Sequence, residues 1–344
     1  MDFESVWNNW HDAGEFSGVF SVRDENGVVF EKCCGFRNMG ESLPNNSETA
    51  FGIASGTKLF TGLSVCTMLD GEKLLLHDRL CDVLPYKLGR ISRKVTIHQL
   101  LTHTSGVGDY IDEETEGSYE QMEDLYCNYP VYLWEDLEYY LPMITKLKPK
   151  FKPGERYGYS NAGYVLLGLV VEAVSGIAFQ DYVREKIIEP CKLLHTGFYR
   201  MDSLPANTAL GYFDDENGEC RTNIFHLPII GGSDGGLYSC AGDLDILWRS
   251  LFSGRLLSDG MLEEFLKPQV MIAGAESYGL GLYRNENADK PVYYAVGGDF
   301  GVDFFTAYSP EHRITLSALA NTETNTFPLF EASLEAMIAQ PGSC

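Results

Sequence analysis

A serine and a lysine three residues apart, Ser55 and Lys58, are the first residues of the chain whose types and spacing suit chemistry. A serine hydroxyl becomes a good nucleophile only when a neighbouring group takes its proton, and a lysine can do so once burial lowers its pKa. Apolar residues recur after the serine at helical spacing, so a helix from Ser55 to about Asp70 would bring the lysine onto the same face. The alternative is a helix N-cap followed by an exposed lysine, because S-x-x-K often arises by chance.

A tyrosine and an asparagine two residues apart, Tyr159 and Asn161, open a long apolar stretch and supply further groups. A tyrosinate can accept the serine proton if an ammonium lowers its pKa, and an amide can orient the lysine or bind a substrate carbonyl. Farther along, Gly297 and Gly298 end a strand-like run, where a backbone N–H could join that of Ser55 in an oxyanion hole. Tyrosine and asparagine are also common at turns and caps, and the glycines also fit a hairpin without function.

Other motifs compete less well for the role of active site. Ser233 lies in a G-x-S-x-G pattern, the nucleophile elbow of α/β-hydrolases, but two glycines follow where a helix should start. The seven histidines have no metal-ligand spacing, so we expect neither a metal site nor another cofactor. His103 is interpreted as structural.

The elements that must position these residues fall into a strand-rich beginning and end with helices between them. The strand-like runs are residues 17–23, 28–34, 278–283, 292–296, 302–308 and 314–319. The predicted helices are residues 1–14, 55–70, 97–101 capped by Thr96, 131–147, 162–174, 179–188, 242–251 capped by Ser239, and 329–338. We therefore predict an α+β fold whose antiparallel sheet is built from both chain ends, with the N-terminal hairpin pairing with the C-terminal strands.

The net charge and the cysteine content indicate which kinds of partner the protein binds and in which cellular compartment it is expected. The 344-residue chain carries a formal net charge of −23, which argues against nucleic acid or an anionic membrane as partner and favours cationic substrates. No stretch is apolar enough to span a bilayer, and no secretory signal begins the sequence. Nine cysteines without CxxC pairs fit reduced thiols, so we expect a cytoplasmic protein. Eight acidic residues in 109–124 predict a solvated loop, with a segment overhanging a cleft as the alternative.

Successive blocks of the chain resemble the serine β-lactamase-like family, which includes class C β-lactamases, penicillin-binding DD-peptidases and family VIII-type esterases. The blocks are residues 51–59, 96–106, 151–176 and 188–199, in the family's order. The resemblance extends from about residue 15 to 335. It implies an α/β lobe made of residues 1–90 and 225–344, and a mostly helical lobe of residues 91–224.

The resemblance also implies roles for the candidate residues. Ser55 would be the acyl-accepting nucleophile, Lys58 its activating partner and Tyr159 the general base that later protonates the leaving group. Asn161 would contact the substrate, and the N–H groups of Ser55 and Gly298 would bind the oxyanion, with Gly297 beside them.

The third motif departs from the family pattern. The family usually places Lys-Thr-Gly or His-x-Gly on the strand that lines the cleft, whereas this chain has Ala295, Val296 and Gly297 there. Because the missing side chains help to hold a substrate carboxylate in the family, we expect an esterase or amide hydrolase that acts through an acyl-enzyme on small esters, amides or lactams. The alternatives are a β-lactamase or DD-peptidase, and a non-turnover penicillin-binding or sensor-type domain. The sequence makes no prediction of the oligomeric state.

Overall fold

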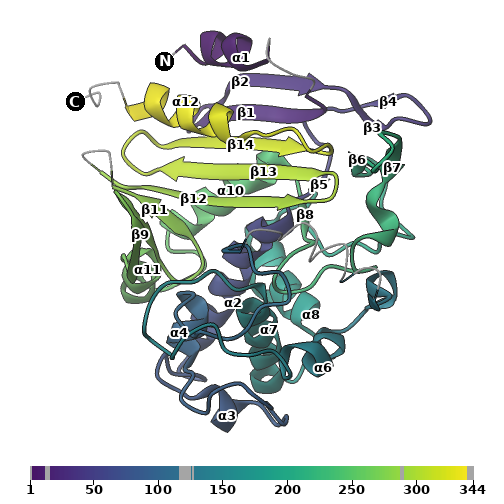
Figure 1. The fold of residues 1–344 in the computed structure, drawn as a ribbon. Coiled ribbons are helices and arrows are strands. Elements are labelled where there is room, and N and C mark those ends of the chain that lie inside the picture. The colour runs from purple at the N-terminus through teal and green to yellow at the C-terminus, as the bar shows by residue number, and fades with distance from the viewer. Residues whose placement is uncertain (1, 12–15, 116–124, 126–127, 287–289, 339–344) are drawn as a thin grey trace.

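The centre of the fold is an eight-stranded antiparallel sheet in the order β2-β1-β14-β13-β12-β11-β10-β9 (Figure 1). Its strands are β1 (Gly18–Asp24), β2 (Gly27–Cys34), β9 (Val270–Ala273), β10 (Glu276–Tyr278), β11 (Tyr283–Asn285), β12 (Val292–Asp299), β13 (Val302–Ser309) and β14 (Ile314–Ala320). The computed structural model describes all residues except 1, 12–15, 116–124, 126–127, 287–289 and 339–344. The pairing of β1 with β14, from Gly18 opposite Ala320 to Arg23 opposite Thr315, confirms that both chain ends build one sheet.

Helices cover both faces of this sheet. The terminal helices α1 (Phe3–His11) and α12 (Phe327–Ile338) lie together on one face, where aromatic side chains such as Phe20, Phe305 and Phe330 form a buried cluster. On the other face, α10 (Ala241–Phe252) places Trp248 against the strands, with its indole N–H donating to Thr306 Oγ1 at 3.0 Å. The sheet therefore separates two apolar cores.

A helical region stands beside the sheet and is built around two buried helices, α2 and α7 (Figure 1). In α2 (Thr57–Asp70), twelve of the fourteen residues are buried, including Lys58, so this helix has no solvent face along most of its length. In α7 (Asn161–Ser175), Ser160 caps the first turn and Gly176, with φ 77°, ends the helix in the left-handed conformation. Two predicted helices near the site thus form with about the expected bounds.

The remaining elements are short. The other helices are α3 (Leu80–Val83), α4 (Ile97–Leu101), α6 (Leu141–Ile144), α8 (Phe179–Val183), the π-helical turn η4 (Arg184–Ile188), α9 (Glu189–Cys191), α11 (Asp259–Leu266) and the 3₁₀ turns η1 (Ala54–Gly56), η2 (Val131–Leu133), η3 (Leu137–Tyr140) and η5 (Asn223–Phe225). The two-stranded pairs are β3 (Phe36–Asn38) with β4 (Leu43–Pro44), β5 (Phe51–Gly52) with β8 (Tyr238–Ser239), and β6 (Tyr212–Asp214) with β7 (Cys220–Thr222). No single helix of the described chain is long and apolar enough to cross a membrane, whereas the bent pair Asn161–Ser175 and Phe179–Cys191 passes on length and composition together.

Three local predictions are wrong. Residues 131–147 form two 3₁₀ turns and a single α-helical turn instead of one helix, because prolines at 130 and 142 remove backbone donors and fix φ. The run 278–283 is split between β10 and β11, since Gly281 has φ +124° and reverses the chain. The cap of α10 is Cys240, not Ser239. The division of the chain into lobes remains a prediction.

Candidate active site

Ser55 lies in the 3₁₀ turn η1, directly before α2. Two hydrogen bonds of Thr57 fix this junction: its hydroxyl donates to Ala54 O at 2.7 Å and accepts from Leu237 N at 3.0 Å. Ala54 has φ +42°, a value that is unusual for a residue with a side chain, so the turn that presents Ser55 is held in a strained conformation. The N–H groups at this end of α2 carry the positive end of the helix dipole.

The Lys58 side chain lies beneath Ser55 and is 2% exposed. Its Nζ donates to Ser55 Oγ at 2.8 Å, to Asn161 Oδ1 at 2.8 Å and to the backbone oxygen of Asp234 at 2.6 Å. Burial lowers the pKa of Lys58, although carboxylates around it, Asp234 first among them, act in the opposite direction. The lysine is thus fixed in place and made easier to deprotonate.

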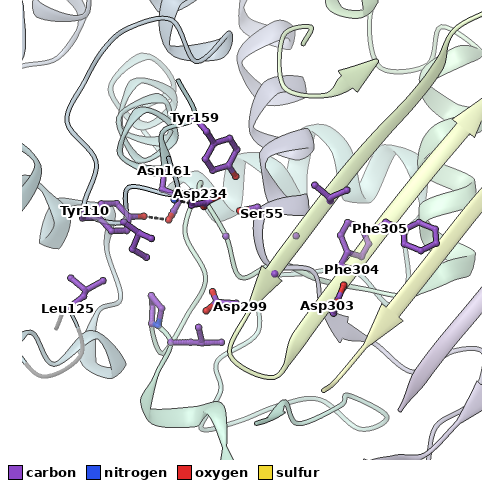
Figure 2. A pocket seen from close by; sticks show the side chains of 18 of the residues that line it. Ser55, Tyr110, Leu125, Tyr159, Asn161, Asp234, Asp299, Asp303, Phe304 and Phe305 are labelled. Carbon is purple, nitrogen blue, oxygen red and sulfur yellow. Dashed lines mark hydrogen bonds between the residues drawn. The ribbon is translucent and has the colours of Figure 1, made fainter. Parts of the chain in front are cut away.

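Tyr159 and Asn161 reach Ser55 from the start of α7. Lys58 Nζ lies 4.9 Å from the centroid of the Tyr159 ring. The Tyr159 hydroxyl forms a hydrogen bond with the Ser55 side chain. Figure 2 shows this hydroxyl directed toward Ser55. Burial, reinforced by the charge of Glu113, raises the pKa of Tyr159 well above its usual value. The tyrosine is therefore held as a neutral phenol.

His103 supports Tyr159 from behind. Its ring stacks on the tyrosine ring at 4.5 Å between centroids, and its Nδ1 accepts the backbone N–H of Ser160 at 3.1 Å. The imidazole is 1% exposed, and burial lowers its pKa well below the usual value, so it stays neutral. We interpret His103 as a residue that positions the tyrosine.

Asp109 anchors the start of α7, contrary to the prediction of a solvated acidic loop. Its carboxylate accepts the backbone N–H groups of Asn161 at 2.6 Å and Ala162 at 3.0 Å, which would otherwise be unpaired at the helix N-terminus. Glu113 accepts from the Asn161 side chain at 3.2 Å. Asp109 is thus tied to the site by helix capping, whereas Glu113 and Glu114 are exposed, and Glu113 lines the cavity as in the alternative of a segment that overhangs a cleft. Glu116, Glu120, Glu123 and Asp124 lie outside the described residues.

Strand β12 forms the opposite wall of the site. A Cβ on Gly297 would lie 2.4 Å from Ile53 O and 2.8 Å from Ser55 N, so only glycine allows the strand to pass this close to η1. A Cβ on Gly298 would meet nothing within 4 Å. Ala295 is buried and Val296 lines the cavity, so this wall presents no side-chain charge at the first two positions of the third motif.

A cavity of about 420 Å³ lies between these walls (Figure 2). Ser55, Tyr159, Asn161, Gly297 and Gly298 all line it. Aromatic and aliphatic side chains form much of the remaining wall: Leu125, Val131, Trp134, Tyr140, Phe304, Phe305, Phe327 and Phe330. Among the described residues, no three His, Cys, Asp or Glu side chains are grouped to hold a metal ion.

Ser233, the competing nucleophile, is fully buried, and its hydroxyl donates to Tyr164 O at 2.8 Å. It does not line the cavity that contains Ser55. Its hydrogen bond joins the glycine-rich loop to α7, which is a structural function.

A family model described as Beta-lactamase matches residues 8–339. The chain belongs to the β-lactamase family. This membership confirms both the resemblance found in the sequence and the predicted α+β fold. The β-lactamase family consists of serine hydrolases.

The first curated relative and the similar solved structures each cover more than nine tenths of this chain. Penicillin-binding protein 4* of Bacillus subtilis is 28% identical over 327 residues, which are 91% of this chain and 69% of that protein. The chain spans 62% and 38% of the length of the next two curated relatives. The crystal structure of a penicillin-binding protein from Bacillus halodurans matches with a TM-score of 0.89 at 38% identity, over 97% of this chain and 99% of that one. The crystal structure of a D-stereospecific amidohydrolase from a Streptomyces species matches with a TM-score of 0.81 at 23% identity, over 96% of this chain and 98% of that one. At this identity the match shows only that the two proteins share a fold.

The structure brings Ser55, Lys58, Tyr159 and Asn161 into one cluster, and Gly297 and Gly298 beside it. Two carboxylates of the site, Asp234 and Asp299, were not singled out from the sequence. Asp299 directly follows Gly298, so the glycine motif itself was the signal that could have found it. Asp234 gives no such signal, because it reaches the site only through folding of the loop between η5 and β8.

Proposed function

We propose that the protein is a serine hydrolase that forms an acyl-enzyme on Ser55 and cleaves small esters or amides. The observation that carries the proposal is the hydrogen bond of 2.8 Å between Lys58 Nζ and Ser55 Oγ, in a cavity where Tyr159 reaches the same hydroxyl. A nucleophile, a base and a proton donor thus meet where a small molecule fits.

The hydrogen bonds of Lys58 support a role as the first proton acceptor. Two of its three partners, Asn161 Oδ1 and Asp234 O, can only accept, whereas the serine hydroxyl can donate or accept. A neutral amine can therefore keep two donated hydrogen bonds and turn its lone pair toward Ser55. Since burial lowers the pKa of Lys58 and raises that of Tyr159, the lysine is the easier group to deprotonate.

In acylation, Ser55 Oγ attacks the substrate carbonyl while its proton passes to Lys58. As the tetrahedral intermediate collapses, the Tyr159 hydroxyl protonates the departing alkoxide or amine, and the tyrosine regains a proton from the lysine. Water then attacks the acyl-enzyme, the same groups take its proton and return it to Ser55, and the carboxylic acid leaves. The sum of the steps is hydrolysis, with the protein unchanged.

Backbone N–H groups of Ser55 and Gly298 supply the oxyanion hole in this proposal. Asp299 and Val302 flank a two-residue turn, so they form a hydrogen-bonded pair between β12 and β13. Because N–H directions alternate along a strand, the N–H of Gly298 points away from β13. Strand β11 pairs with β12 only between Val292 and Tyr294, which leaves the Gly298 N–H facing the cavity edge.

An ester or amide is favoured over a β-lactam or a peptide carboxylate as substrate. Val296 and Ala295 offer no cation or hydroxyl where the family binds a carboxylate, so a negatively charged substrate would lose that ion pair. The amidohydrolase that shares this fold indicates that the scaffold supports amide cleavage.

The test uses wild type, Ser55→Ala and Ser233→Ala with a fluorophosphonate probe, p-nitrophenyl acetate and nitrocefin. We expect the wild type to be labelled and to hydrolyse the ester faster than nitrocefin. Ser55→Ala should lose both labelling and turnover, and Ser233→Ala should keep labelling at Ser55 once circular dichroism shows that it is folded. Turnover that survives Ser55→Ala contradicts the proposal, and labelling without turnover supports the sensor-type alternative.

A further inference from the structure

Every charged side chain that lines the cavity is acidic. Among the described residues these are Glu113, Asp234, Asp299 and Asp303, and no Lys, Arg or His joins them. Figure 2 shows the carboxylates of Asp234 and Asp299 on the same side of Ser55. Because Ser55, the proposed nucleophile, lines this cavity, a substrate would bind there. The negative charge of the cavity therefore influences which substrates bind.

None of the four carboxylates forms an ion pair with a described cation. Asp234 accepts from the Tyr110 hydroxyl, Glu113 from the Asn161 amide and Asp303 from the backbone N–H and hydroxyl of Thr326. Asp299 has only the N–H of the next residue, on Oδ1 at 2.9 Å. Its other oxygen has no partner among the described residues and is available to a ligand.

Two of these carboxylates lie beside the reacting groups. Asp299 directly follows Gly298 in β12. Because Gly298 is the proposed oxyanion donor, Asp299 lies next to the residue that would bind the oxygen of the scissile carbonyl. The backbone oxygen of Asp234 accepts from Lys58 Nζ, which donates to Ser55 Oγ, and the Asp234 carboxylate has the largest effect of any charge on the pKa of Lys58. Lys58 Nζ forms no ion pair with these carboxylates, since its hydrogen bonds go to Ser55 Oγ, Asn161 Oδ1 and the backbone oxygen of Asp234. Its charge acts on them only through space, where it lowers the pKa of Asp234 and Asp299 against the larger effect of burial.

The negative charges of these carboxylates also disfavour one another's ionised form. Burial raises the pKa of Asp299 to about 7, and the charges of Asp234 and Glu113 contribute in the same direction. A cation between them would reverse the repulsion and favour the ionised form. An anion would add to it.

We propose that the cavity selects esters or amides whose acyl part carries a protonated amino group close to the scissile carbonyl and an apolar side chain, with Asp299 and Asp234 binding the ammonium. The inference rests on the proposed function of Ser55. The ammonium donates to the unpartnered oxygen of Asp299, and the apolar group contacts the aromatic wall around Trp134 and Phe304. The neutral Val296 wall fits a substrate without a carboxylate.

The test compares three methyl esters that share one skeleton. They are phenylalanine methyl ester in both enantiomers, the methyl ester of 3-phenylpropanoic acid, which lacks the amino group, and the monomethyl ester of benzylmalonic acid, in which a carboxylate replaces it. At a pH where the amine is protonated, we expect kcat/KM to be at least about tenfold higher for the better amino ester than for the neutral ester, and lowest for the anion. Added salt should shrink the difference.

Asp299→Asn should reduce the ratio of amino ester to neutral ester about tenfold, whereas Glu263→Gln, the same charge change on exposed α11, should leave the ratio as it is. If p-nitrophenyl acetate and the neutral ester are hydrolysed through Ser55 but the amino group brings no advantage, the inference is overturned and the proposed function stands. If no substrate depends on Ser55, the proposed function itself fails. The wild-type comparison and its salt dependence decide the question even where Asp299→Asn does not fold.

Discussion

Replacing Gly297 with alanine tests how closely β12 must approach the nucleophile. The new Cβ would lie 2.4 Å from Ile53 O and 2.8 Å from Ser55 N, whereas ordinary contacts begin at 3.4 Å. The strand and η1 must therefore separate by about 1 Å. The N–H donors of an oxyanion hole lie 2.7–3.1 Å from the oxyanion, so this displacement takes the Gly298 N–H out of hydrogen-bonding range. Loss of one donor should lower kcat by a factor of about 10²–10³.

The assay is saturation kinetics with p-nitrophenyl acetate, together with the rate of fluorophosphonate labelling and a thermal unfolding curve. Overpacking of this kind also destabilises a protein by about 1–3 kcal/mol, so activity is measured well below the unfolding midpoint. Gly260→Ala is the matched control, because a Cβ there meets nothing within 4 Å on α11. A Gly297→Ala protein with wild-type kcat and unchanged stability would refute the close approach of β12 to Ser55 on which the proposed oxyanion hole depends.

Two more predictions follow from buried charges. Lys58→Ala should lower kcat about 10²–10⁴-fold, and Lys58→Arg should not restore it because a guanidinium stays protonated; the rate of probe labelling measures both. Burial raises the pKa of both Asp109 and Asp299 to about 7, so the folded protein keeps protons that the unfolded chain, with a value of 3.8, has already lost. Unfolding free energy should therefore fall as pH rises from 5 to 8, less so in Asp109→Asn. Denaturant titrations check this, and stability that increases over that range contradicts it.

The sequence predicts most of the sheet, because runs rich in β-branched and aromatic residues mark β1, β2, β12, β13 and β14, and a strong turn signal separates the first two. It misses β9, which is only four residues long. It also predicts which polar residues meet, since Ser55 and Lys58 lie one helical turn apart and Tyr159 and Asn161 open the long helix. What these residues do stays a prediction until Ser55 is tested.

Features that depend on contacts between residues far apart in the chain could not be predicted from the sequence. Asp109 looks like one more acid in a run of eight, and only the free N–H groups of α7 give it a buried role. Asp234 comes from the loop before β8 and Asp299 from the end of β12, far apart in the chain, so their shared cavity is a product of tertiary structure. The failed helix over 131–147 shows the reverse case, in which helical apolar spacing yields to backbone limits at proline.

The interleaving of β1 with β14 has a consequence for synthesis on the ribosome. The nucleophile emerges early, but its opposite wall at Gly297 and Gly298 emerges about 240 residues later, and β1 stays unpaired on one edge until β14 follows. At a synthesis rate of about 5–20 residues per second, roughly 10–50 s pass between the synthesis of the Ser55 segment and that of Gly298, before which the proposed oxyanion hole cannot form. An unfinished chain therefore contains Ser55 without the opposite wall of the site, and the proposed hydrolytic activity would arise only when the protein is nearly complete.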